Sequence, residues 1–246
     1  MMGDDVGERL AGGNVGGAWR VADTVRRATG PWTPAVHALL DHLRWRLACV
    51  PTVLGFDEQG REMLTYLPGR EVDTERLNER QLRSVVRWTR TFHEAVADFT
   101  HEGPWRFFTV DEPTLIGHND IAPYNVCFDD DELAGVFDWD FAGPSTPLLE
   151  LAFIAWNCVP MWRDIGAESA AARLRIIAST YGSHSARDIL YAVPHRIQLM
   201  LAGIPVAAAA GDAGMQNLMA GGEPPRSQGP LDDLRRRIPE IAAHLQ

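Results

Sequence analysis

Four polar side chains lie between two apolar runs in the stretch LIGHNDIAPYNVCF: His118, Asn119, Asp120 and Asn125. A carboxylate such as Asp120 can accept a proton, and the amide oxygen of Asn125 can bind a cation. Taken alone, however, the stretch is typical of a polar loop between two strands. A chemical role therefore requires a further reactive group beside it.

The hairpin-like segment YNVCFDDDELAGVFDW supplies that group. Its pattern predicts two strands with a turn centred between Asp131 and Glu132. The residue numbers of two paired positions across such a hairpin add up to a constant. Because 125 and 138 add up to the same number as 131 and 132, Asn125 would lie opposite Asp138. A shift of one residue would move a side chain to the wrong face, so the inference depends on this turn. In this register Asp120, Asn125 and Asp138 face one space, and their oxygens suit Mg²⁺ bound together with a substrate phosphate.

The order of an acid, an amide five residues later, a hairpin and a second acid is that of a kinase catalytic loop and its metal-binding aspartate. The strings HNDIAPYN and GVFDWD resemble the H-x-D-x-x-x-x-N and I-D-W/F/Y motifs of the aminoglycoside phosphotransferase and choline kinase superfamily. The segments FAGPSTPLLELAFIAW and VPTVLGFDEQGREMLTYLPG are also similar to that family's. The resemblance implies an α+β, protein-kinase-like two-lobed fold, with a small antiparallel-sheet N-lobe carrying one helix and a larger, mainly helical C-lobe.

The same resemblance assigns roles to the motif residues. Asp120 is expected to be the catalytic base that deprotonates a substrate hydroxyl. Asn125 and Asp138 are expected to bind Mg²⁺ together with the phosphates of ATP or GTP. His118 would brace the loop by hydrogen bonding, and Asp140 would assist the metal shell or face the substrate.

The resemblance also implies a nucleotide-binding surface in the first part of the chain. The glycine-rich segment Gly12–Gly17 would cover the phosphates, although a flexible hairpin loop explains it nearly as well. Arg26, with Arg27 as the second choice, would hold the α- and β-phosphates, and a solvated strand arginine is the competing explanation for Arg26. The backbone from Thr65 to Leu67 would contact the purine ring.

The sequence departs from the family pattern in its charged residues. All 23 basic residues are arginine, so arginine must replace the family's phosphate-binding lysine. The glutamate that pairs with that lysine should fall near Val36 or His37, where the chain has no acid. The family's G-D-P…D-L-A segment is represented by GPSTP and Glu150, so its first acid is missing and its second is a glutamate.

Hydrophobic periodicity and turn residues predict the elements that position these groups. Residues 1–69 are expected to form the nucleotide-binding lobe and residues 70–246 the helical lobe with the catalytic loop and substrate site. The expected strands are 9–11, 18–21, 24–27 and two around the turn at 57–60. The expected helices begin at 33 and span 79–100, 148–159, 168–181, 186–210 and 231–245, with a polar loop over 220–230.

Bulk properties narrow the range of partners. A net charge of −10 over 246 residues argues against nucleic-acid binding and is compatible with a cationic acceptor. The three cysteines form no C-x-x-C pair, and we found neither a leader nor an apolar run long enough for a membrane span. A cytoplasmic protein without membrane contact is expected, and the sequence leaves the oligomeric state open.

The leading hypothesis is Mg²⁺-dependent transfer of the terminal phosphate of ATP or GTP to a hydroxyl of a small molecule, an aminoglycoside-like antibiotic or an amino alcohol. Helices after Pro147 would form the acceptor pocket. Trp139, Trp156 and Trp162 are expected in the core, although they could instead bind a quaternary amine through cation–π contacts. The alternative is a catalytically impaired kinase-fold binding or immunity protein that sequesters a compound, suggested by the missing lysine and glutamate. A metal-dependent hydrolase is disfavoured, because zinc sites usually use more clustered histidines.

Overall fold

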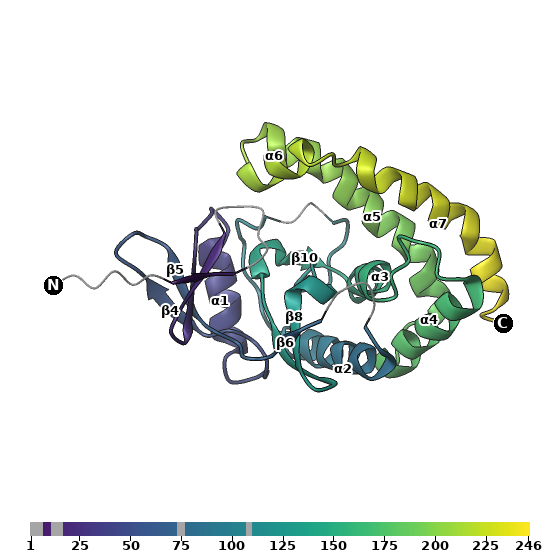
Figure 1. Cartoon of the computed structure of the whole chain (residues 1–246), viewed down its shortest axis with the longest axis horizontal. Helices are drawn as coiled ribbons and strands as arrows, with labels where there is room; N and C mark the ends of the chain where they lie inside the picture. Colours follow the sequence, from purple (N-terminus) through teal and green to yellow (C-terminus); the bar gives the residue numbers. More distant parts are fainter. Residues whose placement is uncertain (1–6, 11–16, 73–76, 107–109) are drawn as a thin grey trace.

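The computed structural model describes residues 7–10, 17–72, 77–106 and 110–246. An antiparallel sheet with one helix forms one end of the molecule, and helices form the other (Figure 1). The expected α+β class is confirmed. The division of the chain after residue 69 remains a prediction.

The sheet end contains five strands in the order β1-β2-β3-β5-β4, and each described pair is antiparallel. Arg27 of β3 lies directly opposite Glu62 of β5 in this register. The β4–β5 turn forms because the Asp57 side chain accepts hydrogen bonds from the N–H groups of Gln59 and Arg61, both at 2.9 Å. The elements are β1 (Glu8–Arg9), β2 (Ala18–Val21), β3 (Thr24–Arg27), α1 (Thr33–Leu43), β4 (Val53–Phe56) and β5 (Glu62–Thr65).

Short strands and two 3₁₀ turns carry the motif residues in the middle of the molecule. One pair joins β7 to β10, and a three-stranded sheet has the order β6-β8-β9. The elements are β6 (Arg70–Glu71), β7 (Leu115–Gly117), η1 (Pro123–Asn125), β8 (Val126–Asp129), β9 (Glu132–Val136), η2 (Trp139–Phe141) and β10 (Gly143–Ser145).

The expected hairpin register is wrong by one position. Asp129 pairs with Glu132, so the turn is centred one residue earlier, between Asp130 and Asp131, and an irregularity between Cys127 and Phe128 shifts the register again. The N–H of Phe137 donates to the Asn125 carbonyl at 3.0 Å, so Phe137 and not Asp138 lies opposite Asn125. The backbone of Asp138 then adopts a left-handed conformation with φ 58° and ψ 68°. This bend changes the direction of the chain at the position that carries the expected metal ligand.

Side-chain caps begin several of the helices in the second half of the structure. Asn78 and Gln81 form a reciprocal capping box at the start of α2, and the Thr146 hydroxyl accepts the Leu149 N–H at the start of α3. Helix α2 ends at Ala95, five residues before the expected end, and the following turn directs Asp98 onto Arg46. The helices are α2 (Glu79–Ala95), α3 (Pro147–Cys158), α4 (Ala167–Tyr181), α5 (Ala186–Ala209), α6 (Ala213–Ala220) and α7 (Pro225–Ala243).

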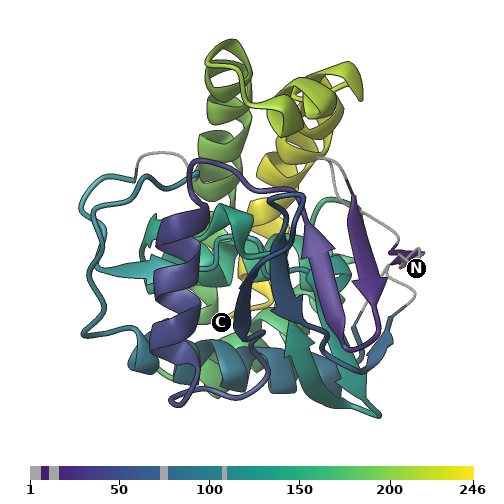
Figure 2. The same ribbon diagram turned by 90° about the vertical axis from the view of Figure 1, so that its left-hand side faces the viewer.

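The chain between α5 and α7 is more helical than expected. Asp212 accepts the Met215 N–H and starts α6, a helix that the sequence analysis missed. Helix α7 begins at Pro225, inside the expected polar loop, because Glu223 accepts hydrogen bonds from the N–H and hydroxyl of Ser227. Seen from the sheet end, α6 and the adjoining ends of α5 and α7 stand above the sheet in green and yellow (Figure 2).

Helix α5 is long and apolar enough, by length and composition, to cross a membrane. Core helices of soluble proteins meet the same criteria. Here α5 packs against α3, α4, α6 and α7, and its Arg196 is buried. These contacts indicate a helix that belongs to the core of the helical part.

Candidate active site

The loop after β7 holds Asp120 at the centre of a hydrogen-bond network. Asn125 Nδ2 donates to Asp120 Oδ2 at 2.7 Å and to the Asp120 carbonyl at 2.9 Å. The Tyr124 hydroxyl donates to Asp120 Oδ1 at 3.1 Å. Both carboxylate oxygens are therefore oriented by groups that follow within five residues, on the 3₁₀ turn η1.

His118 braces this loop as a neutral ring. Its Nε2 lies 3.2 Å from the Phe137 carbonyl, and its Nδ1 lies 3.2 Å from the Asp120 N–H. The carbonyl requires a donor and the N–H requires an acceptor, so the proton is on Nε2. Burial lowers the pKa of His118, which agrees with an uncharged ring. The imidazole also packs on Trp139, a core residue, with ring centroids 4.5 Å apart.

Glu150 of α3 holds the loop through hydrogen bonds to its backbone. Its carboxylate accepts the backbone N–H groups of His118 at 2.9 Å and Asn119 at 2.6 Å. Burial opposes its negative charge, but His93, His118 and the Asn119 N–H outweigh that cost and lower the pKa of Glu150. A side chain at Gly117 would approach the Glu150 carboxylate carbon to 2.8 Å, so a glycine is needed there.

Asn119 connects the loop to the strand β10 and to α5. It adopts a left-handed backbone with φ 63°, a conformation that asparagine tolerates better than most residues. Its Nδ2 donates to the carbonyls of Phe141 and Gly143 at 3.2 and 3.1 Å. Arg196 of α5 donates to the Asn119 carbonyl at 2.7 Å. Burial lowers the pKa of Arg196 to about 10, so it remains charged at neutral pH.

Arg27 of β3 reaches across from the sheet to the two acids after β9. Its Nη1 donates to Asp138 Oδ1 at 3.1 Å, and its Nη2 is ion-paired with Asp140. Its Nε contacts Glu62 Oε1 at 2.9 Å. Burial opposes the charge of Arg27, but the three carboxylates outweigh it and raise the pKa, so the guanidinium stays protonated.

Glu62 provides the acid that is missing from α1. It lies on β5, opposite Arg27, and its second oxygen is 2.8 Å from His37 Nε2 of α1. A basic residue on the third strand thus has a carboxylate partner, supplied by a neighbouring strand. The sequence analysis missed Glu62 because it sought the acid near Val36 or His37.

The structure corrects the choice between the two neighbouring arginines of β3. Successive strand residues point to opposite faces. Arg27 lines the central pocket, whereas Arg26 points away toward Asp57, with Nη1 and Oδ2 4.0 Å apart. The lining of the pocket therefore favours Arg27, the second choice, over Arg26, and the role of either arginine in holding phosphates stays a prediction.

Most of the other residues expected to bind the nucleotide line the same pocket or lie outside the described residues. Thr65 and Leu67 both line the central pocket, as does Tyr66 between them. Of the glycine-rich segment Gly12–Gly17, only Gly17 lies within the described residues, and it also lines the pocket.

One cavity of about 860 Å³ joins these groups between the sheet and the helices. Volumes of this order are typical of small-molecule sites. Its walls include Asp120, Asn125, Asp138 and Asp140 from the motif segments, together with Arg27 from the sheet. Burial, reinforced by the nearby charge of Asp138, raises the pKa of Asp120 to about 8. The cavity therefore contains Asp120 mainly in its protonated form at neutral pH, beside a second acid.

The donor atoms of this cavity fit a hard divalent cation. Asn125 uses its amide nitrogen to bind Asp120, which leaves the amide oxygen as the atom available to a metal. Asp138 supplies a carboxylate that is 34% exposed. Within the described ranges, no group of three or more His, Cys, Asp or Glu side chains could hold a metal ion. Such a site suits Mg²⁺ shared with phosphate oxygens and gives no support to a zinc hydrolase.

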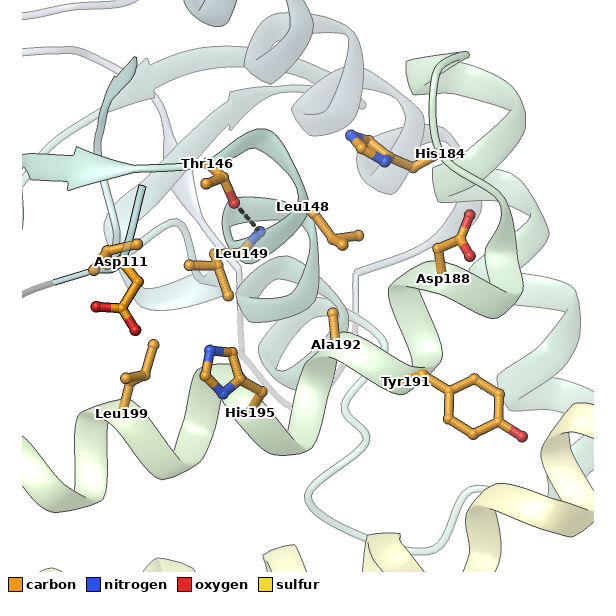
Figure 3. A pocket seen from close by; sticks show the side chains of 11 residues that line it. Asp111, Thr146, Leu148, Leu149, His184, Asp188, Tyr191, Ala192, His195 and Leu199 are labelled. Atoms are coloured by element: carbon orange, nitrogen blue, oxygen red, sulfur yellow. Dashed lines mark hydrogen bonds between the residues drawn. The ribbon is translucent and has the colours of Figure 1, made fainter. Parts of the chain in front are cut away.

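A second hollow of about 530 Å³ lies between the start of α3 and α5. Figure 3 shows Thr146 and Leu149 on one side and His195 on the other. Its Asp188 is already used to cap α5 through Ser185. None of the motif residues lines this hollow, so the candidate site is the central cavity.

Comparison with known sequences agrees with this geometry. A family model described as the phosphotransferase enzyme family matches residues 109–187, which contain the catalytic loop and the hairpin. The trifolitoxin immunity protein of Rhizobium leguminosarum bv. trifolii is 31% identical over 190 residues, covering 74% of this chain and 71% of that protein.

Solved structures of low sequence identity share the fold. The amicoumacin kinase hAmiN, solved with AMP-PNP, Ca²⁺ and amicoumacin, has a TM-score of 0.63 at 11% identity and covers 96% of this chain and 88% of its own. The aminoglycoside phosphotransferase APH(3'')-Id of Streptomyces rimosus, solved with ADP and streptomycin, has a TM-score of 0.58 at 17% identity. The match covers 80% of this chain and 94% of that one. A choline/ethanolamine kinase family protein of Mesorhizobium loti has a TM-score of 0.57 at 16% identity. The match covers 97% of this chain and 90% of that one. The chain therefore belongs to the phosphotransferase enzyme family and has the protein-kinase-like fold of its aminoglycoside and choline kinase relatives.

Proposed function

We propose that this protein transfers the terminal phosphate of ATP or GTP to a hydroxyl group of a small molecule. The observation that carries the proposal is the single cavity in which Asp120, Asn125 and Asp138 face Arg27 from the opposite side. Two carboxylates, an amide oxygen and a guanidinium are the groups that phosphoryl transfer requires for a base, a metal and charge neutralisation.

Asp120 acts as the catalytic base in this proposal. The hydrogen bonds from Tyr124 and Asn125 fix its carboxylate so that a lone pair can accept the proton of the acceptor hydroxyl. Its pKa of about 8 keeps it mainly protonated at neutral pH when no cation is bound, and a cation held beside it by Asn125 and Asp138 would favour the charged form that accepts the proton. Asn125 and Asp138 hold Mg²⁺, which neutralises phosphate charge when bound.

Arg27 binds the nucleotide phosphates, and Glu62 holds its guanidinium in place. Because Nε, Nη1 and Nη2 each already contact a carboxylate, the phosphate oxygens would be bound by the second N–H of Nη1 and of Nη2. The segment from Thr65 to Leu67 contacts the purine ring. The N–H groups of Thr65 and Tyr66 are already used by the Thr52 and Asp23 carbonyls, so recognition relies on the remaining backbone groups.

Arg27→Gln should weaken nucleotide binding far more than Arg26→Gln. Each change removes one positive charge from β3, but only Arg27 lines the cavity. We expect a 10–100-fold higher Kd for MgADP in the first variant, about 1.4–2.7 kcal/mol, and a change below twofold in the second. Isothermal titration calorimetry measures both. Equal losses in the two variants would contradict the assignment of Arg27.

The similarity to an immunity protein motivates a second candidate. The trifolitoxin immunity protein shares 31% identity with this chain, so a protein that protects by binding a compound without transferring phosphate is the competing proposal. The absence of lysine favours it, whereas the Arg27–Glu62 pair favours the enzyme.

A nucleotide screen separates the two candidates. We expect ATP or GTP to raise the melting temperature by several degrees when Mg²⁺ is present, and by less when it is absent. A library of antibiotics and amino alcohols, assayed for ADP or GDP release, then identifies the acceptor. Lack of any nucleotide binding by folded protein would contradict the kinase and favour the binding protein. We also propose that the protein acts in the cytoplasm, where both nucleotides are available.

A further inference from the structure

The end of the central cavity away from the sheet is lined mainly by apolar side chains. They come from η2, α3, α5 and α6 and are Phe141, Phe153, Trp156, Met200, Ile204 and Leu218. This end belongs to the same cavity as Asp120 but is formed by helical elements and not by the strand of Arg27, so it is where an acceptor would bind under the proposed function. An apolar wall of this kind rewards burial of apolar ligand surface.

Two of the three aromatic rings of this wall, Phe141 and Phe153, already have a guanidinium over one face. The guanidinium of Arg106 lies 4.3 Å from the ring centre of Trp32 and 4.9 Å from that of Phe141. Arg196 lies 4.3 Å from the ring centre of Phe153. A ring face that holds a guanidinium cannot bind an ammonium group in the same place, so the covered faces of Phe141 and Phe153 are closed to a cationic ligand.

The carboxylates near this end are also engaged. Glu223, which lines the cavity, accepts hydrogen bonds from the N–H and hydroxyl of Ser227 at 3.2 and 2.8 Å. Asp140 lies between two arginines, ion-paired with Arg27 and 3.3 Å from Nη1 of Arg106. An ammonium group would thus have to displace an arginine to pair with Asp140, whereas the partners of Glu223 are neutral donors from Ser227.

Arg226, at the start of α7, differs from these carboxylates because it has no ion-pair partner among the described residues. It lines the cavity and is exposed. Its guanidinium is therefore available to an acidic or neutral polar group of a ligand, and it repels a cation. The lining of the whole cavity contains four arginines and five acids, so the positive charge is local to the surroundings of Arg226.

We propose that the acceptor is an apolar hydroxyl compound that is uncharged or carries an acidic group near Arg226, and not a polyamine or a quaternary ammonium. This inference rests on the proposed function for the identity of the ligand as an acceptor. It departs from the cationic acceptor that net charge alone suggested.

Competition for a fluorescent probe tests the selectivity. The folded protein, with and without saturating MgADP, is titrated with 8-anilinonaphthalene-1-sulfonate, which is aromatic and anionic. We expect 2-naphthaleneethanol to displace the dye at concentrations at least tenfold lower than streptomycin or choline. Displacement by streptomycin or choline at equal or lower concentrations would overturn the inference.

Two pairs of matched variants locate the effect in this cavity. Leu218→Glu adds a carboxylate to the wall, whereas Met219→Glu adds one to the exposed neighbouring position. Arg226→Gln removes the unpaired charge, whereas Arg236→Gln removes an exposed arginine elsewhere on α7. We expect Leu218→Glu to weaken dye binding at least tenfold and Arg226→Gln three- to tenfold, with less than twofold change in each control. Equal effects in a variant and its control would also overturn the inference.

The proposed function has its own readout in the same experiment. MgADP binding is followed by the change in melting temperature of each variant. If MgADP does not bind but 2-naphthaleneethanol still displaces the dye preferentially, the kinase proposal fails while the selectivity of the cavity stands. If MgADP binds and streptomycin is the better competitor, the inference fails while the kinase proposal stands.

Discussion

Asp120→Asn is expected to abolish phosphoryl transfer and, at the same time, to stabilise the metal-free protein near pH 8. Loss of the proton acceptor should lower kcat by about 10²–10⁴-fold, the usual contribution of a general base. Nucleotide affinity should change little, because Asp120 binds neither Arg27 nor the sheet directly. A steady-state assay of ADP release measures the loss.

The stability effect follows from the proton that Asp120 carries. Burial and the charge of Asp138 raise its pKa to about 8 in the folded protein, whereas an unfolded aspartate has a pKa of about 3.9. Between these values the folded state binds more protons than the unfolded state, so stability falls as pH rises from about 4 through about 8. An amide does not ionise and escapes this cost. The melting temperature of the variant should exceed that of the wild type by at least about 3 °C at pH 8, with the difference shrinking toward pH 4.

Asp129→Asn is the control for both effects. It removes the same charge from an exposed position at the end of β8. We expect it to leave kcat and the pH dependence of melting unchanged. Full activity of Asp120→Asn would exclude Asp120 as the base, and a melting difference that is constant from pH 5 to pH 8 would contradict its raised pKa.

Glu150→Gln should have the largest effect on stability. The buried carboxylate accepts two loop N–H groups, and His93 Nε2 lies 3.6 Å away, slightly too far for a hydrogen bond but close enough for charge attraction. The amide of glutamine has one acceptor oxygen and turns an N–H₂ group toward the loop. We expect the free energy of unfolding at pH 7 to fall by about 3 kcal/mol or more, as measured by urea denaturation. Because the loop carries Asp120, kcat should fall as well.

Acid should reduce the difference between wild type and Glu150→Gln. The pKa of Glu150 is lowered in the folded protein, so its charge contributes stability above the unfolded value of about 4.3, and this contribution is lost as pH falls toward the folded value. Glu240→Gln, on exposed α7, is the matched control and should be neutral at every pH. A constant deficit of Glu150→Gln between pH 7 and pH 4 would show that shape and not charge holds the loop.

The motif loop and the alternation of elements could be predicted from sequence, because they depend on contacts within about 20 residues. The acid and amide of the loop lie five residues apart, and Asn125 does bind Asp120 in the structure. The hairpin was also expected, but its register could not be predicted, since the irregularity after Cys127 leaves no clear mark in the pattern. Asp138 reaches the cavity through its left-handed backbone and not through the expected pairing.

Long-range contacts of charged residues were not accessible from sequence. All four residues of β3 are half-buried, so no alternation of burial distinguishes Arg26 from Arg27. Arg196 reaches the Asn119 carbonyl from 77 residues away, and Arg106 reaches Asp212 from 106 residues away. Helix α6 was missed because its start depends on Asp212 as a cap within a stretch of small residues.

The location of Glu62 has a consequence for control of the protein. In protein kinases the acid that holds the phosphate-binding lysine lies on a helix, and movement of that helix turns the enzyme on and off. Here the pair joins directly opposed positions of two hydrogen-bonded strands, so Arg27 and Glu62 come together whenever the sheet is folded. Moving α1 would remove only the His37 contact. The pairing of Arg27 with Glu62 therefore does not depend on the position of a helix, and in the proposed kinase a movement of α1 would not make or break it.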